Sequence, residues 1–332
     1  MSRPTLHPDL LAVDCAAEVQ RIGAFLLRAV RDFNKRGVVL GLSGGVDSAV
    51  CAALAVRALG PQRVFALLMP ERDSSSSSTR LAAEVAHHLG IAHTVEDITP
   101  ALEAIGCYRW RDDAVRAVLP DYTPQWQIKL AISGGLAGGI NHFRLIARSP
   151  DGQMHDVRLP LREYLQIVAA TNHKQRLRKT LEYFHADRLN HAVIGTPNRL
   201  EYDQGFFVKN GDGSADIKPI AHLYKTQVYA LARHLGLPEA VCNAAPTTDT
   251  FSLPQGQDEF YFALPWAQMD LALWARNHDY SAEELASALG CTPAQAAAVL
   301  ADIDTKRRAT RYLHAAPARI DAALQPHAQH PD

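Results

Sequence analysis

The sequence predicts an α/β protein built on a doubly wound parallel sheet, with an inserted segment that contains a hairpin and a small helical part near the C-terminal end. Short apolar runs alternate with segments of helical period. This alternation favours a parallel sheet covered by helices on both faces. A glycine-rich string also separates the first apolar run from the helix that follows it.

The expected elements follow this alternation from the N-terminal end. Apolar residues recur at spacings of three and four in the predicted helices, whereas the predicted strands are short apolar runs bounded by glycines or turn residues. The order is helix 16–33, strand 37–42, helix 46–59, strand 64–69, helix 79–89, strand 92–98, helix 163–188 and strand 191–196.

One segment, 100–160, breaks the alternation. Its runs 143–147 and 154–159 flank Pro150-Asp151-Gly152, which predicts a hairpin with a turn at its tip. We interpret this segment as an insertion or a cover over the sheet. The chain as a whole, residues 1–332, is expected to form one domain.

The segment 265–320 is predicted to be helical. Ser281 with Glu284 forms a capping box, and Pro293 follows Thr292, so both positions predict the start of a helix. We expect a small helical appendage here.

Composition excludes several classes of protein. The chain has 332 residues, of which 47% are hydrophobic and 21% charged, as in ordinary globular proteins. A formal net charge of -1 gives no field that would steer it onto nucleic acid or a membrane. The five cysteines form no C-x-x-C pair, which argues against a zinc site and a disulfide framework. Without a signal peptide or a membrane-spanning apolar run, the sequence predicts a cytoplasmic protein with no nucleic-acid or membrane partner.

The strongest functional signal is the string G-L-S-G-G-V-D-S at residues 41–48, between the first predicted strand and its helix. Glycines let backbone N–H groups approach an anion closely, and the helix adds its positive N-terminal end, so phosphate is the expected ligand. Asp47 is placed to hold Mg²⁺ beside bound phosphates, although an aspartate in a first helical turn could serve only the helix dipole.

Other polar segments have structural explanations as well as functional ones. The serine run 74–78 is typical of a flexible solvated loop, or of a lid, because ligands of open α/β sheets bind at the carboxyl ends of the strands. The stretch 211–213 is a turn by composition. Glu201 and Lys225 could be solvated surface charges, and the basic stretch 174–179 could be a hydrated helix face.

The string at residues 41–48 resembles the pyrophosphatase loop of the N-type ATP pyrophosphatases, and it lacks the lysine that follows the glycines of a Walker A loop. Further pieces look like the signature of the ammonia-dependent NAD synthetases within that superfamily. These pieces are residues 195–201, 205–209, 211–220 and 223–228. The resemblance covers residues 37–99 and 165–315, and it implies the adenine nucleotide alpha hydrolase-like form of the predicted fold.

The resemblance implies a ligase of NAD biosynthesis that amidates nicotinate adenine dinucleotide with ammonia. ATP and the substrate carboxylate form an acyl-adenylate with release of pyrophosphate, and ammonia then displaces AMP. ATP is the co-substrate, Mg²⁺ is the metal, and a homodimer is the implied assembly. Only about forty residues precede the phosphate loop. We therefore expect no glutaminase domain, and ammonia that comes from solution or from a separate donor protein.

The resemblance also assigns residues to the site. The ATP site comprises Ser43, Gly44, Gly45, Asp47, Ser48, Met69, Thr196 and Lys225. Asp47 and Glu201 are the implied Mg²⁺ ligands. The catalytic residues are Lys225, which neutralises phosphate charge, and Asp212 and Thr247 near the ammonia position, with Asp212 as the acceptor of a proton from NH₄⁺. The substrate residues are Asn172, Arg176, Phe206, Lys209 and Asp216.

Some positions depart from the family pattern. Residues 202–204 (Tyr-Asp-Gln) replace small or aliphatic residues, Ala244 stands near an expected lysine, and the segment 100–160 has no counterpart in compact ammonia-dependent members. These departures leave open a second hypothesis, an amide synthetase that adenylates another carboxylate. A third hypothesis is a nucleotide-binding protein without catalysis, against which the paired metal ligands argue.

Overall fold

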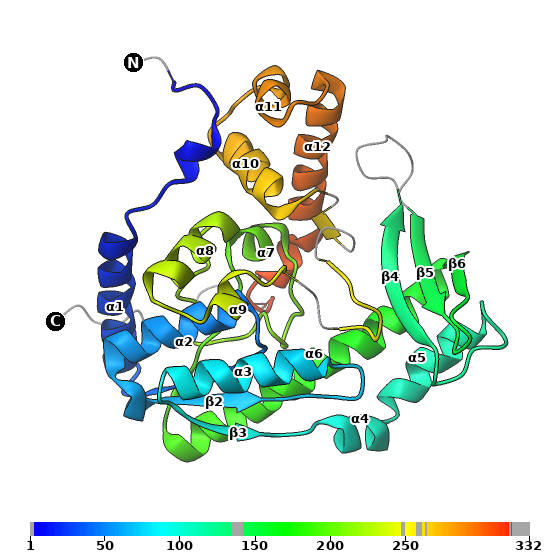
Figure 1. Ribbon diagram of the computed structural model, residues 1–332, viewed down its shortest axis with the longest axis horizontal. Coiled ribbons are helices and arrows are strands. Elements are labelled where there is room, and N and C mark those ends of the chain that lie inside the picture. The colour runs from blue at the N-terminus through cyan, green and yellow to red at the C-terminus, as the bar shows by residue number, and fades with distance from the viewer. Residues whose placement is uncertain are drawn as a thin grey trace.

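The central sheet of the protein is parallel and has the strand order β3-β2-β1-β7 (Figure 1). The computed structural model describes residues 3–133, 142–246, 250–256, 261–262, 264–318 and 320. The strands are β1 Val38–Gly41, β2 Val64–Leu68, β3 Ala92–Val95 and β7 Ala192–Val193. Because all four run in one direction, their carboxyl ends meet at one edge, where ligands of open α/β sheets bind.

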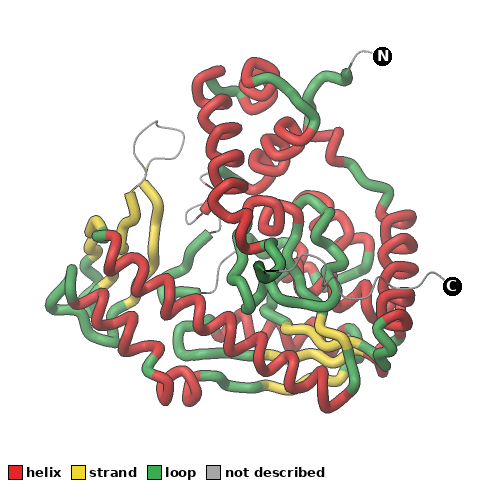
Figure 2. Tube along the Cα trace, turned by 180° about the vertical axis from the view of Figure 1, so that it is seen from behind, coloured by secondary structure: helices red, strands yellow, loops and turns green. Residues whose placement is uncertain are grey.

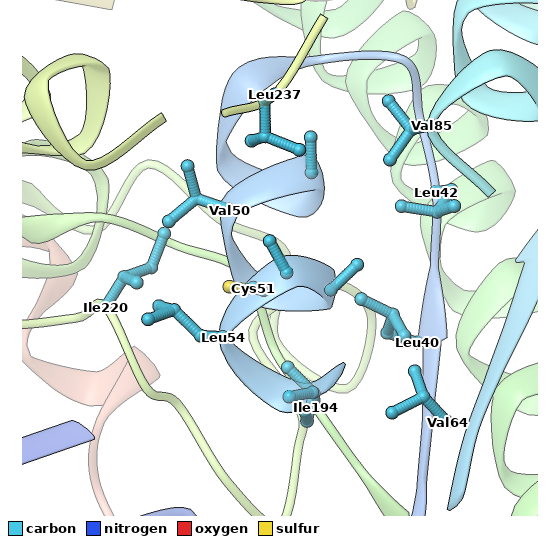
Figure 3. Close-up of a cluster of buried hydrophobic side chains, with 14 of the residues drawn as sticks. Leu40, Leu42, Val50, Cys51, Leu54, Val64, Val85, Ile194, Ile220 and Leu237 are labelled. Atoms are coloured by element: carbon cyan, nitrogen blue, oxygen red, sulfur yellow. The ribbon is translucent and has the colours of Figure 1, made fainter. Parts of the chain in front are cut away.

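Helices cover both faces of this sheet, so the doubly wound prediction is confirmed. One face packs against α1 Cys15–Asp32, α2 Val46–Leu59, α3 Ser76–His88 and α8 Lys225–His234. The other face packs against α4 Thr99–Ile105, α5 Cys107–Arg116 and α6 Leu161–Leu189. Figure 3 shows the first core, in which Leu40 of β1 lies among the side chains of α2 and its neighbours. Within the described part of the chain, no helix is long and apolar enough to cross a membrane.

A second sheet is antiparallel, with the order β4-β5-β6. Its strands are β4 Gln127–Ser133, β5 His142–Arg148 and β6 Met154–Arg158. The pair β5–β6 is the predicted hairpin, and Gly152 in its turn has a φ of 91°. Strand β4 was not predicted from the sequence. Its residues Ile128 and Leu130 are buried and alternate with Gln127 and Lys129, as in a half-buried strand. Figure 2 shows the strands of the two sheets as separate groups.

The C-terminal helices form a layer of their own beyond the sheet (Figure 1). They are α10 Trp266–Asn277, α11 Ala282–Leu289 and α12 Pro293–Thr310, and α11 and α12 begin at the two predicted caps. Their apolar side chains share one core with Leu200 of α7 Arg199–Gln204 and with Leu11 of the short helix Pro8–Leu11. The short helices Pro61–Arg63, α9 Glu239–Cys242 and Arg311–Leu313 complete the described elements.

The serine run differs from the expectation of a flexible solvated loop. Helix α3 begins at Ser76, and the Ser75 Oγ caps it by accepting the backbone N–H of Ser78 at 3.1 Å. Serine is a favoured cap because its short side chain satisfies a free N–H of the first helical turn. The run is therefore the N-terminus of a helix.

Candidate active site

The phosphate loop joins β1 to α2 and is held by its own serines. The Ser48 Oγ donates to the Gly45 carbonyl oxygen at 3.0 Å and lies 3.1 Å from the Ser43 Oγ. The backbone N–H of Gly45 donates to the Ser43 Oγ at 3.2 Å. Gly45 is the N-cap residue of α2 and has no side chain to occupy the first N–H groups of that helix. Those groups are free to bind an anion.

Gly44 brings this loop into contact with the start of α3. It has a φ of 83°, in the left-handed region that glycine tolerates best. A Cβ atom added there would lie 2.4 Å from the carbonyl oxygen of Ser78. The close approach of two backbones therefore requires glycine at this position.

A pocket lined by both polar and apolar residues lies at the carboxyl edge of the sheet, beside the phosphate loop. Its walls come from β1 and the loop, from the end of β2 and the serine run, from α6, and from the segments after β7. The lining residues are Gly41, Leu42, Ser43, Ser48, Leu68, Met69, Pro70, Ser74, Ser78, Thr79, Gln175, Arg178, Lys179, Glu182, Thr196 and Asp212. The pocket thus collects Ser43, Ser48, Met69, Thr196 and Asp212 from the sequence prediction.

Asp47 lies in the first turn of α2 and contacts two other segments. Its carboxylate forms an ion pair with the Nζ of Lys225, the first residue of α8, and its Oδ1 accepts the side-chain amide of Asn198 at 3.0 Å. The backbone N–H of Asn198 donates to the Glu201 Oε2 at 3.1 Å. Asn198 therefore holds the two predicted metal ligands near one another.

Lys225 is a buried cation, with only 1% of its surface exposed. Burial lowers the pKa of its ammonium group, but the charges of Asp47 and Glu201 outweigh that effect and raise the pKa above its usual range. The same carboxylates reach Cys51, whose thiol pKa is raised by burial first and by their charge second. The expectation that Lys225 could be a solvated surface charge is wrong.

The carboxylates of the described residues could bind a metal ion only together with oxygen atoms of a substrate. Within the described ranges, no group of three His, Cys, Asp or Glu side chains is placed to hold a metal ion. Mg²⁺ is usually bound in proteins by one or two carboxylates together with substrate phosphates. Asp47 and Glu201, which Asn198 joins beside the phosphate loop, are the described residues that could hold such an ion.

The far wall of the pocket carries a second charged group. On α6, the Lys179 Nζ donates to the Glu182 Oε2 at 2.6 Å, and both side chains are buried. The Asp212 Oδ1 accepts the backbone N–H of Val208 at 2.7 Å. Burial raises the pKa of the Asp212 carboxyl, although Lys179 acts in the opposite direction. Asp212 is therefore a better proton acceptor than an exposed aspartate.

The other predicted substrate residues lie outside the lining of this pocket. The Asp216 Oδ2 accepts the backbone N–H of Val193 at 2.7 Å, and the Lys209 Nζ donates to the Tyr312 carbonyl oxygen at 2.8 Å. The Arg176 Nε donates to the Lys209 carbonyl oxygen at 3.2 Å, and Asn172 lies one turn earlier on α6. The ring of Phe206 stacks on that of Tyr261, with centroids 4.7 Å apart. Thr247 lies outside the described residues.

Sequence reasoning placed Asn172 and Arg176 of α6 at the substrate but did not assign to the site the four residues of this helix that line the pocket. Gln175, Arg178, Lys179 and Glu182 all line it, and their spacing of three and four along a helix is the signal that could have revealed them. The basic stretch 174–179 is not a hydrated face, because Lys174 and Lys179 are 2% and 5% exposed.

Residues 202–204, which depart from the family pattern, contact the C-terminal part of the chain. The carboxylate of Asp203 accepts two hydrogen bonds from Arg307 of α12, at 2.5 and 2.8 Å. The ring of Tyr202 packs edge-on against His314, with centroids 4.7 Å apart. The Gln204 carbonyl oxygen accepts the hydroxyl of Tyr261 at 2.7 Å. Tyr202 and Asp203 thus contact other parts of the chain through their side chains, and Gln204 does so through its main chain.

A glycine-rich loop that starts a helix at the carboxyl edge of a parallel sheet defines the class of α/β nucleotide-binding proteins. Comparison with known proteins narrows that class. The family model described as NAD synthase matches residues 18–117 and 152–312. The chain belongs to the NAD synthase family.

A relative whose name is close to that of the family is similar to this chain over nearly the whole length of both proteins. The NH(3)-dependent NAD(+) synthetase of Rhizobium meliloti (strain 1021) is 56% identical over 317 residues, which are 95% of this chain and 95% of the relative. An alignment of this extent takes in most of the segment 100–160, so that segment is shared with relatives of similar length.

Solved structures share the fold. The NMN synthetase from Francisella tularensis has a TM-score of 0.65 at 23% identity, covering 93% of this chain and 99% of that one. An NH3-dependent NAD synthetase from Campylobacter jejuni, in complex with the nitrate ion, has a TM-score of 0.62 at 23% identity, covering 93% and 100%. At these identities the likeness shows the fold alone.

Proposed function

We propose that this chain amidates nicotinate adenine dinucleotide with ammonia to form NAD, consuming ATP and releasing AMP and pyrophosphate. The observation that carries the proposal is the 56% identity to an NH(3)-dependent NAD(+) synthetase over 95% of both chains. Two further observations support it. The pocket beside the phosphate loop is lined by Ser43 and Ser48 of that loop, and the helix that the loop starts carries Asp47, which pairs with the buried Lys225 and is joined to Glu201 through Asn198.

The reaction needs no enzyme nucleophile. An oxygen of the substrate carboxylate attacks the α-phosphorus of ATP, pyrophosphate leaves, and ammonia attacks the acyl-adenylate to release AMP. Catalysis of such steps is mostly positioning and electrostatic stabilisation. The loop around Ser43 and Gly45 would bind the phosphates, and Lys225 would neutralise the charge that develops on the leaving pyrophosphate.

Mg²⁺ would be held by Asp47 and Glu201 together with the phosphates, and would supply further positive charge there. Asp47→Asn and Glu201→Gln should each raise the Mg²⁺ concentration needed for half-maximal rate, because a neutral amide is a poorer ligand for a hard cation. A Mg²⁺ titration of the purified variants measures this. An unchanged titration in either variant removes that residue from the metal site.

Asp212 would act at the second step. Its carboxyl faces the pocket, and burial makes it a stronger base than an exposed aspartate. We assign it the proton that NH₄⁺ loses as ammonia attacks. Thr247 is proposed as its neighbour at the ammonia position, and Asn172, Arg176, Phe206, Lys209 and Asp216 are proposed to contact the dinucleotide.

The direct test supplies the purified protein with nicotinate adenine dinucleotide, ATP, Mg²⁺ and NH₄⁺. NAD should form with one AMP and one pyrophosphate for each NAD. Lys225→Met should lower kcat by roughly a hundredfold, as expected for the loss of one preorganised charge. ADP and phosphate as products would contradict the proposed chemistry.

The alternative, another carboxylate as substrate, rests on an observation about the fold. The fold is shared with a protein whose printed name is NMN synthetase, so the fold alone does not select the carboxylate. The departure of residues 202–204 from the family pattern is one reason for this alternative. That reason is weaker than the sequence suggests, because Asp203 binds Arg307 of α12. Pyrophosphate release with a panel of carboxylates decides it: release with another acid but no NAD would favour the alternative.

We also propose a homodimer, with ammonia taken from solution. Two large apolar side chains one turn apart at the start of α6 are exposed, Leu161 and Leu165, at 68% and 53%. Exposed apolar side chains that neighbour each other in this way are suited to covering by a second chain. Sedimentation equilibrium should give twice the mass of the chain, and glutamine should not replace ammonium. A monomer, or efficient use of glutamine, would contradict the corresponding part.

A further inference from the structure

Asp270 is a fully buried carboxylate in α10, with an exposed fraction of 0%. Its neighbours Met269 and Leu271 are buried apolar residues of the C-terminal core. A carboxylate in such a place is costly unless hydrogen bonds satisfy its oxygens. Its partners therefore indicate why the chain keeps it there.

Both oxygens of Asp270 bind the first turn of α8. The Oδ1 accepts the backbone N–H of Lys225 at 3.1 Å, and the Oδ2 accepts the backbone N–H of Thr226 at 2.6 Å. The first N–H groups of a helix have no partner within the helix, and the residue before this one, Tyr224, lacks the short side-chain oxygen of a usual cap. A carboxylate from another helix supplies the cap, and its charge suits the positive end of α8.

The residue capped in this way is also the one that reaches the phosphate site. The main chain of Lys225 is fixed by Asp270, and its ammonium group pairs with Asp47 at the start of α2. Its side chain is buried along its length. The position of its Nζ therefore depends on where the backbone of α8 begins.

We propose that Asp270 is a positioning residue for the adenylation step, which holds the first turn of α8 so that the Lys225 ammonium stays at the phosphate site. The inference rests on the proposed function, and it gives the C-terminal helices a part in catalysis. A catalytic group misplaced by about 1 Å can cost a hundredfold in rate. Asp270 need not touch ATP to matter to its reaction.

A double-mutant cycle tests the coupling. Asp270→Asn keeps the size of the side chain but turns one acceptor into a donor that faces a backbone N–H group. It should lower kcat for NAD formation about tenfold, the value of a lost cap expressed as a rate. Lys225→Met should cost roughly a hundredfold. If Asp270 acts through Lys225, the double variant is no slower than Lys225→Met alone.

The same cycle is run on the affinity for a non-hydrolysable ATP analogue. Losses that multiply in both cycles, to about a thousandfold in kcat, would overturn the proposal, because independent sites give additive free energies. Asp304→Asn is the matched control: it removes a carboxylate that binds Arg276 of α10 at 2.9 Å and has no contact with α8 among the described residues. It should leave both cycles unchanged.

The two readouts separate this inference from the proposed function. If the wild-type protein forms no NAD, the proposed function fails, while the binding cycle still reports whether Asp270 acts through Lys225. Circular dichroism shows whether Asp270→Asn folds. Should it not fold, Asp270→Glu keeps the charge and displaces the oxygens by one methylene, and it must then show the same non-additivity with Lys225→Met.

Discussion

At the scale of single residues, Gly44 joins the phosphate loop to the helix of the serine run. Gly44→Ala places a Cβ atom 2.4 Å from the Ser78 carbonyl oxygen, so one of the two backbones must move. We expect the affinity for ATP to fall about tenfold or more, since the loop N–H groups would no longer converge on the phosphates. Calorimetric titration with a non-hydrolysable ATP analogue measures this.

Gly60 provides the control for that substitution. It has the same φ of 83°, but a Cβ atom added there meets nothing within 4 Å. Gly60→Ala therefore isolates the cost of a backbone conformation that glycine alone adopts readily, about 1–3 kcal/mol of unfolding free energy. It should leave ATP affinity unchanged. Equal effects of the two variants on ATP affinity would show that the contact with Ser78 is not what matters.

Asp212 allows the two half-reactions to be separated. Asp212→Asn should stop NAD formation but preserve the ATP–pyrophosphate exchange that reports acyl-adenylate formation, because the proposed proton transfer belongs to the second step. The pH dependence follows from the raised pKa of Asp212, which burial causes despite Lys179. Below that pKa the carboxyl is protonated and cannot accept a proton.

The wild-type rate of NAD formation should therefore fall as the pH drops, starting above the usual range of an aspartate, while exchange persists further into acid. Glu182, the other carboxylate facing this group, is paired with Lys179. Measuring both rates across the same pH range checks the assignment. Parallel loss of exchange and NAD formation in Asp212→Asn would assign Asp212 to the first step.

At the scale of elements, α7 depends on α12. A helix of six residues is too short to be stable by itself, and it carries Glu201. Arg307 of α12 binds Asp203 of α7 through two hydrogen bonds. Arg307→Met should loosen α7 and raise the Mg²⁺ concentration for half-maximal rate several-fold, since charge-assisted hydrogen bonds of this kind contribute about 1.5–3 kcal/mol.

The control for this prediction is the next residue along α12. The Arg308 NH2 group donates to the Thr305 Oγ1 within the same helix, at 2.9 Å. Arg308→Met therefore removes an arginine without loosening α7. The Mg²⁺ titration should distinguish the two variants; if it does not, the contact between α12 and α7 does not position Glu201.

The elements that the sequence predicted well are those with a strong local pattern. The helix from Val46 to Leu59 matches its expected bounds, because apolar periodicity and the preceding glycines mark its length and its start. The two C-terminal caps at Ser281 and Thr292 are local hydrogen-bonding patterns and are confirmed. Strand β7, by contrast, ends at Val193 rather than near Thr196, since its length depends on pairing with β1.

Contacts between distant segments could not be read from the sequence. Lys225 was expected at the phosphates only because of a family resemblance. Its ion-pair partner Asp47 lies 178 positions away, so no local pattern links the two residues. Asp270, which caps α8, carries no local pattern that marks it. Asn198 and Glu201 do form a local capping box, but the sequence does not show that the Asn198 side chain also reaches Asp47. Their roles arise only when the parallel sheet brings the ends of several elements to one edge.

At the scale of the whole molecule, a buried charge cluster joins the antiparallel sheet to the edge of the central sheet. The Lys174 Nζ of α6 donates to the Glu71 Oε1 at 2.8 Å and to the Asp73 Oδ2 at 2.7 Å, both in the segment after β2. Arg111 of α5 also pairs with Asp73. Helices α5 and α6 in turn contribute to the core under the antiparallel sheet. The cluster thus connects the segment 100–160 with the border of the pocket.

Lys174→Met should therefore destabilise the entire protein. Removing one partner of a buried ion pair leaves the other charge uncompensated, at a cost of about 3–5 kcal/mol of unfolding free energy. Lys174 is 2% exposed, so water cannot replace it. Arg144→Met is the comparison, because its pair with Asp156 has side chains 41% and 47% exposed and should contribute less than about 1 kcal/mol. Urea unfolding of both variants measures the difference, and a Lys174→Met loss as small as that of Arg144→Met would show that the cluster does not hold the two sheets together.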